Sequence, residues 1–429
     1  MKAAIIGGGI SGLTLGWNLK QRGIDFALFE KGVRTGGWIK SCQTEGFLFE
    51  KGPHSCRTRG AGRTTLELIE QLGLENEVIG ASPAAKRRYF YSRGEFKQVP
   101  VCPVSLLLSP WRSGVLKALW NDWRTPQGSG DDESIHQFVS RRLSPQLADQ
   151  LFDPFVTGIF AGDIRQLSVQ ACFPLMSSWE KEHGGLLKGL WARRKQKPKQ
   201  RGSPFIQKML KTSIFSFRNG MQTLTDTLES KLKSHIQLNK EAIKLEKRGE
   251  RWEIYFRDGT SHVADQIYMT LPASQAALLL PECPDLARIP YASLAIVSFG
   301  YKRSVLKKEG FGYLIPSSEK ENVMGVLWDS SVFPEQNHHP EETRLTVMLR
   351  PGDDPLKRAQ QALTRHLDIH AEPDASSLYF ADQAIPQYTV GHLEKLKRIE
   401  QQLPPSITLL GSSYRTLSVN ECIAEALAV

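Results

Sequence analysis

Residues 2–30, KAAIIGGGISGLTLGWNLKQRGIDFALFE, decide the fold. The apolar start predicts a buried strand, the middle predicts a helix, and the last six residues predict a second strand that ends at Glu30. In the turn between them, Gly7, Gly9 and Gly12 have the G-x-G-x-x-G spacing that lets backbone approach a pyrophosphate at a helix N-terminus. This order of elements predicts a Rossmann-like nucleotide-binding domain.

The residues after the second strand indicate which dinucleotide is bound. Glu30 stands where a carboxylate accepts hydrogen bonds from ribose hydroxyls, and its charge would repel a 2′-phosphate. Arg34, Gly36 and Gly37 follow at once, and then Trp38. A cation beside a bare glycine pair suits a second phosphate or the flavin side of a longer dinucleotide. We therefore interpret the site as one for FAD rather than NAD.

The bulk composition is that of a globular protein with two or three domains. The chain has 429 residues, of which 40% are hydrophobic and 23% charged. The first residues, MKAAIIGGGIS, break into glycines too early for a signal peptide, and no apolar run is long enough to span a bilayer. We expect a cytoplasmic protein, or one that lies on the cytoplasmic face of a membrane.

The cysteines and the metal-ligating residue types indicate no metal site. The six cysteines are scattered, without a C-x-x-C pair or a cluster with histidines. A zinc site or a disulfide framework is therefore not expected, and buried thiols are the favoured interpretation.

The net charge of +10 favours an anionic partner. Its densest part is residues 188–211, which hold nine Lys or Arg and no Asp or Glu. With Trp191 nearby, this stretch suits an anionic membrane surface. A solvated loop is the next interpretation, and a nucleic-acid patch is a distant third.

Longer segments carry a family resemblance. They are GGGISGL, FEKGVRTGGWIKS and GFLFEKGPH near the start, DPFVTGIFAGDIRQLSVQACFP at 153–174, GFGYLIPSSE at 310–319, AIPQYTVGH at 384–392 and GSSYRTLSVNECI at 411–423. Together they resemble the flavin-dependent protoporphyrinogen oxidases of the amine-oxidase superfamily. The resemblance covers nearly the whole chain.

The resemblance implies an α/β fold with three domains. A discontinuous FAD-binding domain would comprise residues 1–86, 212–273 and 378–429. A substrate-binding domain on a mixed sheet would comprise 87–103 and 274–377. A helical, membrane-associated domain would comprise 104–211.

The resemblance also implies a set of non-covalent FAD contacts drawn from five segments. These are Gly7, Gly8, Gly9, Ile10, Ser11 and Gly12; Glu30, Lys31, Arg34, Gly36, Gly37 and Trp38; Gly52, Pro53, His54 and Ser55; Ala242; and Thr416, Leu417, Ser418 and Val419. The last group makes physical sense, because a helix N-terminus stabilises negative charge on a reduced flavin.

For the substrate, the resemblance implies a porphyrinogen held in an apolar slot. Arg88 would hold a propionate, while Phe311, Leu314 and Met348 would sandwich the macrocycle. Ordinary core packing would be the favoured interpretation of the apolar three without the resemblance. Flavin N5 would accept hydride in three two-electron steps, with electrons passed to oxygen or another acceptor. We therefore expect no catalytic side chain.

Three alternatives stay open at this point. The same machinery could oxidise coproporphyrinogen III, whose four carboxylates would want more cations. An amine oxidase would use an aromatic cage, for which Tyr388 and Tyr414 are candidates. A flavin-free carrier of prenylated proteins shares the fold.

The helical domain favours membrane contact over nucleic acid, and a homodimer is left open.

Overall fold

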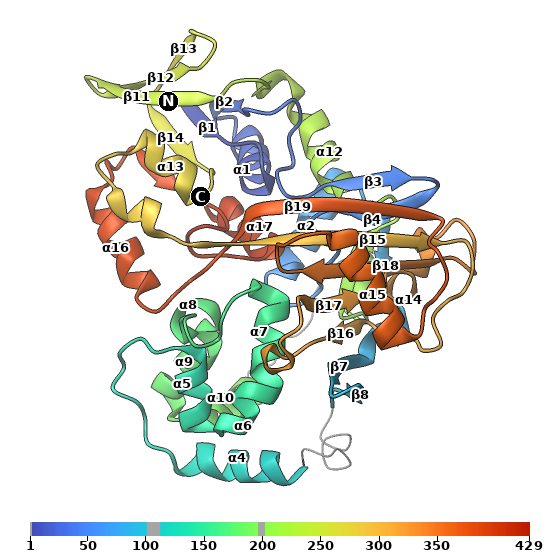
Figure 1. Cartoon of the computed structure of the whole chain (residues 1–429). Helices are drawn as coiled ribbons and strands as arrows, with labels where there is room; N and C mark the ends of the chain where they lie inside the picture. The colour runs from blue at the N-terminus through green and yellow to red at the C-terminus, as the bar shows by residue number, and fades with distance from the viewer. Residues whose placement is uncertain (1, 101–111, 196–201) are drawn as a thin grey trace. The chain divides into compact units, whose positions relative to one another are not determined.

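The computed structural model describes residues 2–100, 112–195 and 202–429 and divides into two compact units (Figure 1). The first unit comprises Met1–Ala81, Gly202–Pro290 and Lys395–Val429. The second comprises Ser82–Arg201 and Tyr291–Glu394. The three-domain division expected from the resemblance stays a prediction, and residues 101–111 and 196–201 of it lie outside the described part.

A five-stranded parallel sheet lies at the centre of the first unit. Its order is β10-β2-β1-β14-β20, with β1 at Lys2–Ile6, β2 at Asp25–Phe29, β10 at Ile236–Gln237, β14 at Gln266–Met269 and β20 at Ile407–Leu409. Residues 3–6 of β1 are buried on both faces, as a central parallel strand requires. The strand–turn–helix–strand order predicted from residues 2–30 is confirmed.

Helices of the first unit bury their apolar faces against this sheet and against one another. They are α1 (Ile10–Gln21), α2 (Gly62–Leu72), α11 (Pro204–Met209), α12 (Gln222–Leu232), α13 (Ala273–Leu279), α17 (Val419–Ala428) and most of α16 (His392–Gln402). Helix α1 packs against α12 and α17. Leu13 of α1, Leu228 of α12 and Ile423 of α17 are wholly buried in one core.

Three small antiparallel sheets complete the first unit. They are β3 (Ser41–Thr44) with β4 (Phe47–Glu50); β11 (Ala242–Arg248), β12 (Arg251–Phe256) and β13 (Ser261–Ala264); and β5 (Cys56–Arg57), β9 (Ile214–Phe217) and β6 (Val78–Gly80). The segment that links β10 to β11 returns to the end of β2, where the Lys240 N–H donates to the Glu30 carbonyl at 2.9 Å.

A seven-stranded mixed sheet organises the second unit. Its order is β19-β15-β18-β17-β16-β7-β8, with β7 at Arg88–Ser92, β8 at Glu95–Gln98, β15 at Tyr291–Tyr301, β16 at Gly312–Leu314, β17 at Val323–Leu327, β18 at Thr343–Leu349 and β19 at Ala375–Pro386. Figure 1 shows β15 and β19 as long neighbouring ribbons, in agreement with their antiparallel pairing. A tight turn at Arg93–Gly94 joins β7 to β8 in an antiparallel hairpin.

The two faces of this sheet have different surroundings. One face buries Tyr313, Val326 and Val347 in a core shared with α15 (Pro355–Leu367). Side chains alternate along a strand, so neighbouring residues such as Leu314 and Met348 lie on the opposite face. Helix α7 (Asp153–Phe160) reaches that opposite face, because a Cβ on Gly158 would lie 2.6 Å from the Leu314 side chain.

The described part of residues 104–211 is helical, as predicted. In the second unit it forms α4 (Arg112–Arg124), α5 (Ile135–Arg142), α6 (Pro145–Leu147), a π-helical turn at Ala148–Phe152, α7, α8 (Val169–Cys172), α9 (Pro174–His183) and α10 (Leu186–Lys195). Ser134 caps α5 in a capping box with Gln137. Asp153 ties α7 to the sheet by accepting hydrogen bonds from the Ser317 N–H and hydroxyl at 2.7 and 2.9 Å.

Candidate functional site

The glycine loop between β1 and α1 combines tight backbone contacts with one open position. Gly7 has φ +113°, and a Cβ on Gly12 would lie 2.1 Å from the Gly7 carbonyl oxygen. A Cβ on Gly9, in contrast, meets nothing within 4 Å. Gly9 is also the N-cap of α1 and supplies no side-chain cap to the first-turn N–H groups. The loop thus leaves room and unsatisfied donors where an anion binds.

Glu30 closes this loop from the end of β2. Its Oε2 accepts from the Gly8 N–H at 2.7 Å, and its Oε1 accepts from the Gly32 N–H at 2.8 Å. A carboxylate has about four lone-pair positions, so both oxygens can still accept from hydroxyl groups. Lys31 next to it is exposed. The predicted ribose acceptor therefore lies beside the predicted phosphate loop.

Arg34 is directed at its own loop. Its guanidinium donates to the carbonyl oxygens of Thr35 at 2.7 Å, Gly37 at 2.8 Å and Ile39 at 3.2 Å. These contacts hold the Gly36–Gly37 turn, in which both glycines have positive φ. The Gly36 N–H donates to the Gly8 carbonyl at 2.7 Å. Arg34 thus shapes the turn that lies against the glycine loop.

Thr35 connects the same turn to α12. Its hydroxyl donates to Glu229 Oε2 at 2.5 Å, and its N–H approaches the same oxygen at 3.4 Å. Thr35 is only 3% exposed. Sequence reasoning passed over both residues, because Thr35 is the variable position of the Arg-x-Gly-Gly motif and Glu229 lies 194 residues away.

Gly52 packs on the backbone of Trp38. A Cβ on Gly52 would lie 1.8 Å from the Trp38 carbonyl oxygen, so only glycine fits. Pro53, His54 and Ser55 follow and are half-buried. The segments around the glycine pair and after β4 are therefore fitted to each other.

The two remaining predicted contact segments are connected to the glycine loop through neighbouring residues. Ala242 begins β11 and pairs with Phe256, whose ring lies 4.6 Å from that of Phe29 at the end of β2. In the loop before α17, a Cβ on Gly411 would lie 3.1 Å from the Ser11 hydroxyl.

The start of α17 is held by two acids. Ser418 caps the helix in a capping box with Glu421, so Thr416 and Leu417 precede the cap and Val419 is the first helical residue. Oε2 of Glu425 accepts from the Gly411 N–H at 2.9 Å and from the Thr416 hydroxyl at 3.3 Å. Burial raises the pKa of Glu425.

These residues fit a dinucleotide. The open position at Gly9, the uncapped start of α1 and the Glu30 carboxylate supply phosphate and ribose partners in one loop cluster. In the described residues, no group of three His, Cys, Asp or Glu side chains could hold a metal ion.

In the second unit, Arg88 begins β7 on the face opposite α15. Its guanidinium carbon lies 4.7 Å from the centre of the Phe311 ring. Phe311 precedes Gly312, which has φ +127° and pairs with Arg88 across the strands. The Phe311 ring and the Arg88 cation thus meet just before β16 begins.

Leu314 and Met348 lie in one cross-strand row on this face. Leu314 pairs with Gly325, and Gly325 pairs with Met348. The Leu314 side chain lies over Gly325, where an added Cβ would be 2.8 Å from it. Both Leu314 and Met348 are partly exposed. The structure thus brings the four predicted substrate residues to one face of the sheet, although their contact with substrate stays a prediction.

Comparison with known proteins identifies the family. The model of the flavin containing amine oxidoreductase family matches residues 10–418. The chain belongs to this family. It is therefore a flavin-dependent oxidoreductase, and the resemblance noted from its motifs is confirmed.

Within this family, the chain is similar to enzymes named for the oxidation of porphyrinogens. Human protoporphyrinogen oxidase is 35% identical over 98% of this chain and 95% of its own length. Coproporphyrinogen III oxidase of Bacillus subtilis is 24% identical over 99% of this chain and 96% of its own length. An Exiguobacterium protein assigned as a protoporphyrinogen oxidase has a crystal structure with TM-score 0.83 at 22% identity, covering all of this chain and 97% of that one. That last likeness shows the fold.

Proposed function

We propose that this chain oxidises protoporphyrinogen IX to protoporphyrin IX in haem biosynthesis, with FAD as its cofactor. The observation that carries the proposal is the full-length identity with protoporphyrinogen oxidases, together with the apolar face on which Arg88 lies. A large apolar macrocycle with carboxylate arms needs an apolar surface with a cation beside it.

The residues of the first unit would hold the cofactor without a covalent bond. First-turn N–H groups of α1 would bind its phosphates, Glu30 would accept from ribose, and the start of α17 would stabilise negative charge on the reduced flavin. When bound, FAD supplies a hydride acceptor for three two-electron oxidations and passes the electrons to oxygen.

The residues of the second unit would hold the substrate. Phe311, Leu314 and Met348 present apolar surface to the macrocycle, and the Arg88 guanidinium binds a propionate through charge-assisted hydrogen bonds. The chain thus binds and orients the substrate, and the cofactor carries the chemistry.

A comparison of two porphyrinogens tests the proposed substrate. The purified protein, loaded with FAD, is given protoporphyrinogen IX or coproporphyrinogen III, and the fluorescent porphyrin product is followed with time. We expect faster turnover of protoporphyrinogen IX. An equal or greater rate with coproporphyrinogen III would contradict the proposal.

We further propose that the protein associates peripherally with a membrane, at its cytoplasmic face. Along α4, Leu116, Trp120 and Trp123 recur at helical spacing and are 56%, 60% and 56% exposed. On neighbouring α10, Leu190 and Trp191 are 42% and 68% exposed. These five residues are called the tryptophan face below. Exposed tryptophan beside basic charge is typical of membrane interfaces.

Two cationic side chains contact the tryptophan rings of this face. The Arg124 guanidinium lies 5.3 Å from the Trp120 ring centre, and the Lys188 ammonium lies 5.0 Å from that of Trp123. Anionic headgroups would pair with these charges while the rings enter the interface. No helix among the described residues is long and apolar enough to cross a bilayer, so the proposed contact is with the surface.

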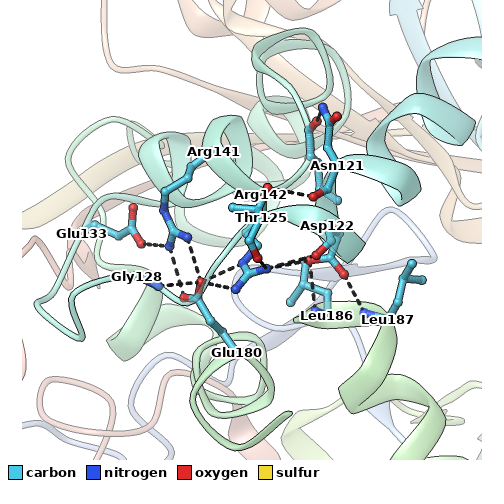
Figure 2. A network of polar contacts seen from close by, with 11 residues as sticks. Asn121, Asp122, Thr125, Gly128, Glu133, Arg141, Arg142, Glu180, Leu186 and Leu187 are labelled. Atoms are coloured by element: carbon cyan, nitrogen blue, oxygen red, sulfur yellow. Dashed lines mark hydrogen bonds and ion pairs between the residues drawn. The ribbon is translucent and has the colours of Figure 1, made fainter. Parts of the chain in front are cut away.

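A buried ion network holds α4 and α10 side by side (Figure 2). The Asp122 carboxylate on α4 accepts from the Leu186 and Leu187 N–H groups at the start of α10, at 3.1 and 2.9 Å. Arg142 of α5 is wholly buried and donates to the Asp122 carbonyl at 3.1 Å and to Glu180 of α9 at 2.7 Å. The network thereby fixes the contact between the two helices that carry the tryptophan face.

Vesicle binding tests the membrane proposal. The protein should sediment with vesicles that contain anionic phospholipid and much less with neutral ones. The double variant Trp120→Ser/Trp123→Ser should lose most of this binding, whereas Leu278→Ser, which removes a side chain 79% exposed in the first unit, should keep it. Equal binding by both variants would contradict the assignment of this face.

A further inference from the structure

The hairpin β7–β8 continues the face on which Arg88 lies. Its rings Tyr91 and Phe96 point to the other side, because each lies within 6 Å of the Tyr313 ring, at 5.9 and 5.1 Å between centroids. Tyr313 belongs to the core that α15 covers. Side chains alternate along a strand, so the neighbours of these rings lie on the face of Arg88.

Phe96 has two charged neighbours, the carboxylate Glu95, which is exposed next to the turn, and the cation Lys97. Lys97 pairs directly with Phe90, and Phe90 pairs with Leu314. Lys97 therefore lies in the same cross-strand row as Leu314, Gly325 and Met348. It is partly exposed.

The Lys97 ammonium is not used in an ion pair within the described part of the chain. The carboxylate of Glu319 interacts electrostatically with Lys97. A hydrogen bond from Ser92 lowers the pKa of Glu319, and the charges of Arg93 and Lys97 lower it less strongly. Glu319 already accepts from the Ser92 hydroxyl at 2.6 Å and from the Arg93 N–H at 3.2 Å. The N–H groups of the Lys97 ammonium are therefore available to bind a ligand.

We propose that Lys97 and Arg88 form a two-point site for the two propionates of the porphyrinogen, with Lys97 binding the second carboxylate. The inference rests on the proposed function. Because Arg88 is diagonal to Lys97 across β7 and β8, their Cα atoms are about 7–8 Å apart. Both side chains are long and flexible, so the distance between the two cationic groups can adjust by several ångströms to the spacing of two carboxylates.

This arrangement matches the chemistry of a dicarboxylate. The two propionates of protoporphyrinogen IX are on neighbouring pyrrole rings, so they leave the macrocycle on the same edge. Two cations at adjacent positions of one hairpin can bind both, while the apolar row of Leu314 and Met348 contacts the ring. The four carboxylates of coproporphyrinogen III surround the macrocycle and would leave two without these partners.

The test compares the substrate with its dimethyl ester in the FAD-loaded protein. For Lys97→Gln we expect KM for protoporphyrinogen IX to rise roughly tenfold with kcat nearly unchanged, because a charge-assisted contact made in substrate and transition state alike is lost. KM for the dimethyl ester, which lacks the carboxylates, should not change. Lys97→Arg should restore the low KM.

Lys308→Gln is the matched control. Lys308 lies over the Phe96 ring at 5.2 Å, on the core side of the same hairpin, and its variant should leave both KM values unchanged. An unaltered KM in Lys97→Gln, or an equal rise for acid and ester, overturns the inference while the proposed function stands. An unaltered protein that oxidises neither compound overturns both.

Discussion

Gly52→Ala places one methyl group between two segments of the candidate flavin site. The added Cβ would lie 1.8 Å from the Trp38 carbonyl oxygen, and ordinary contact begins at 3.4 Å, so the segments must separate by about 1.6 Å. Overpacking of this kind costs about 1–3 kcal/mol, of which about 0.4–1 kcal/mol is offset by the lower entropy of the unfolded chain. The expected loss of stability is therefore small.

The expected loss of FAD affinity is larger. Binding groups must be held to within about 0.5 Å, and Trp38 would move by more than that together with the neighbouring glycine pair. We expect FAD to bind at least about tenfold more weakly, which corresponds to about 1.4 kcal/mol. The dissociation constant is measured by titrating apoprotein with FAD and following flavin fluorescence.

Gly46→Ala is the matched control. Gly46 lies in the β3–β4 turn with φ +84°, and its Cβ would meet nothing within 4 Å. The left-handed backbone costs an alanine about 1–2 kcal/mol, so stability falls to a similar extent without movement of Trp38. Urea unfolding of both variants checks this equivalence. A Gly52→Ala protein that binds FAD as tightly as Gly46→Ala would refute the reasoning.

Three further predictions follow from single contacts. Thr35→Val and Glu229→Ala should each weaken FAD binding, and the double variant should bind no more weakly than Glu229→Ala alone, because both changes remove the same hydroxyl–carboxylate hydrogen bond; additive losses would contradict the contact. Arg142→Met should lower the free energy of unfolding by about 3–5 kcal/mol, since Asp122 stays buried without its cation and Glu180 keeps only Arg141; urea unfolding measures it, and a loss below about 1 kcal/mol would contradict the network in Figure 2. Burial lowers the pKa of His366, so the unfolded chain takes up the proton first and stability falls as the pH drops below about 6.5; His366→Gln should reduce this slope, and an unchanged slope would show that other groups cause it.

Local elements of the fold could be predicted because their signals are short-range. The glycine spacing and the flanking apolar runs predicted β1, α1 and β2. Each depends on the φ preference of glycine or on a hydrophobic period within a few residues. The family motifs added the order of the later segments.

Contacts between distant segments could not be predicted. The motif indicated that Arg34 offers charge to a phosphate, but the closing of the loop directs its guanidinium to three carbonyl oxygens. Which side chain of α12 contacts Thr35 depends on how that helix is rotated about its axis, and the sequence does not specify this rotation. The face shared by Leu314, Met348 and Lys97 depends on strand order and register, which a single sequence does not specify.

Anaerobic reduction of the bound flavin by its proposed substrate tests the central claim most directly. Purified protein, saturated with FAD and freed of oxygen, is mixed with protoporphyrinogen IX while flavin absorbance and porphyrin fluorescence are recorded together. We expect the flavin to bleach and to regain its colour when oxygen is admitted, and we expect protoporphyrin IX to accumulate. A yellow protein whose flavin stays oxidised under protoporphyrinogen IX would show that this compound is not its reductant.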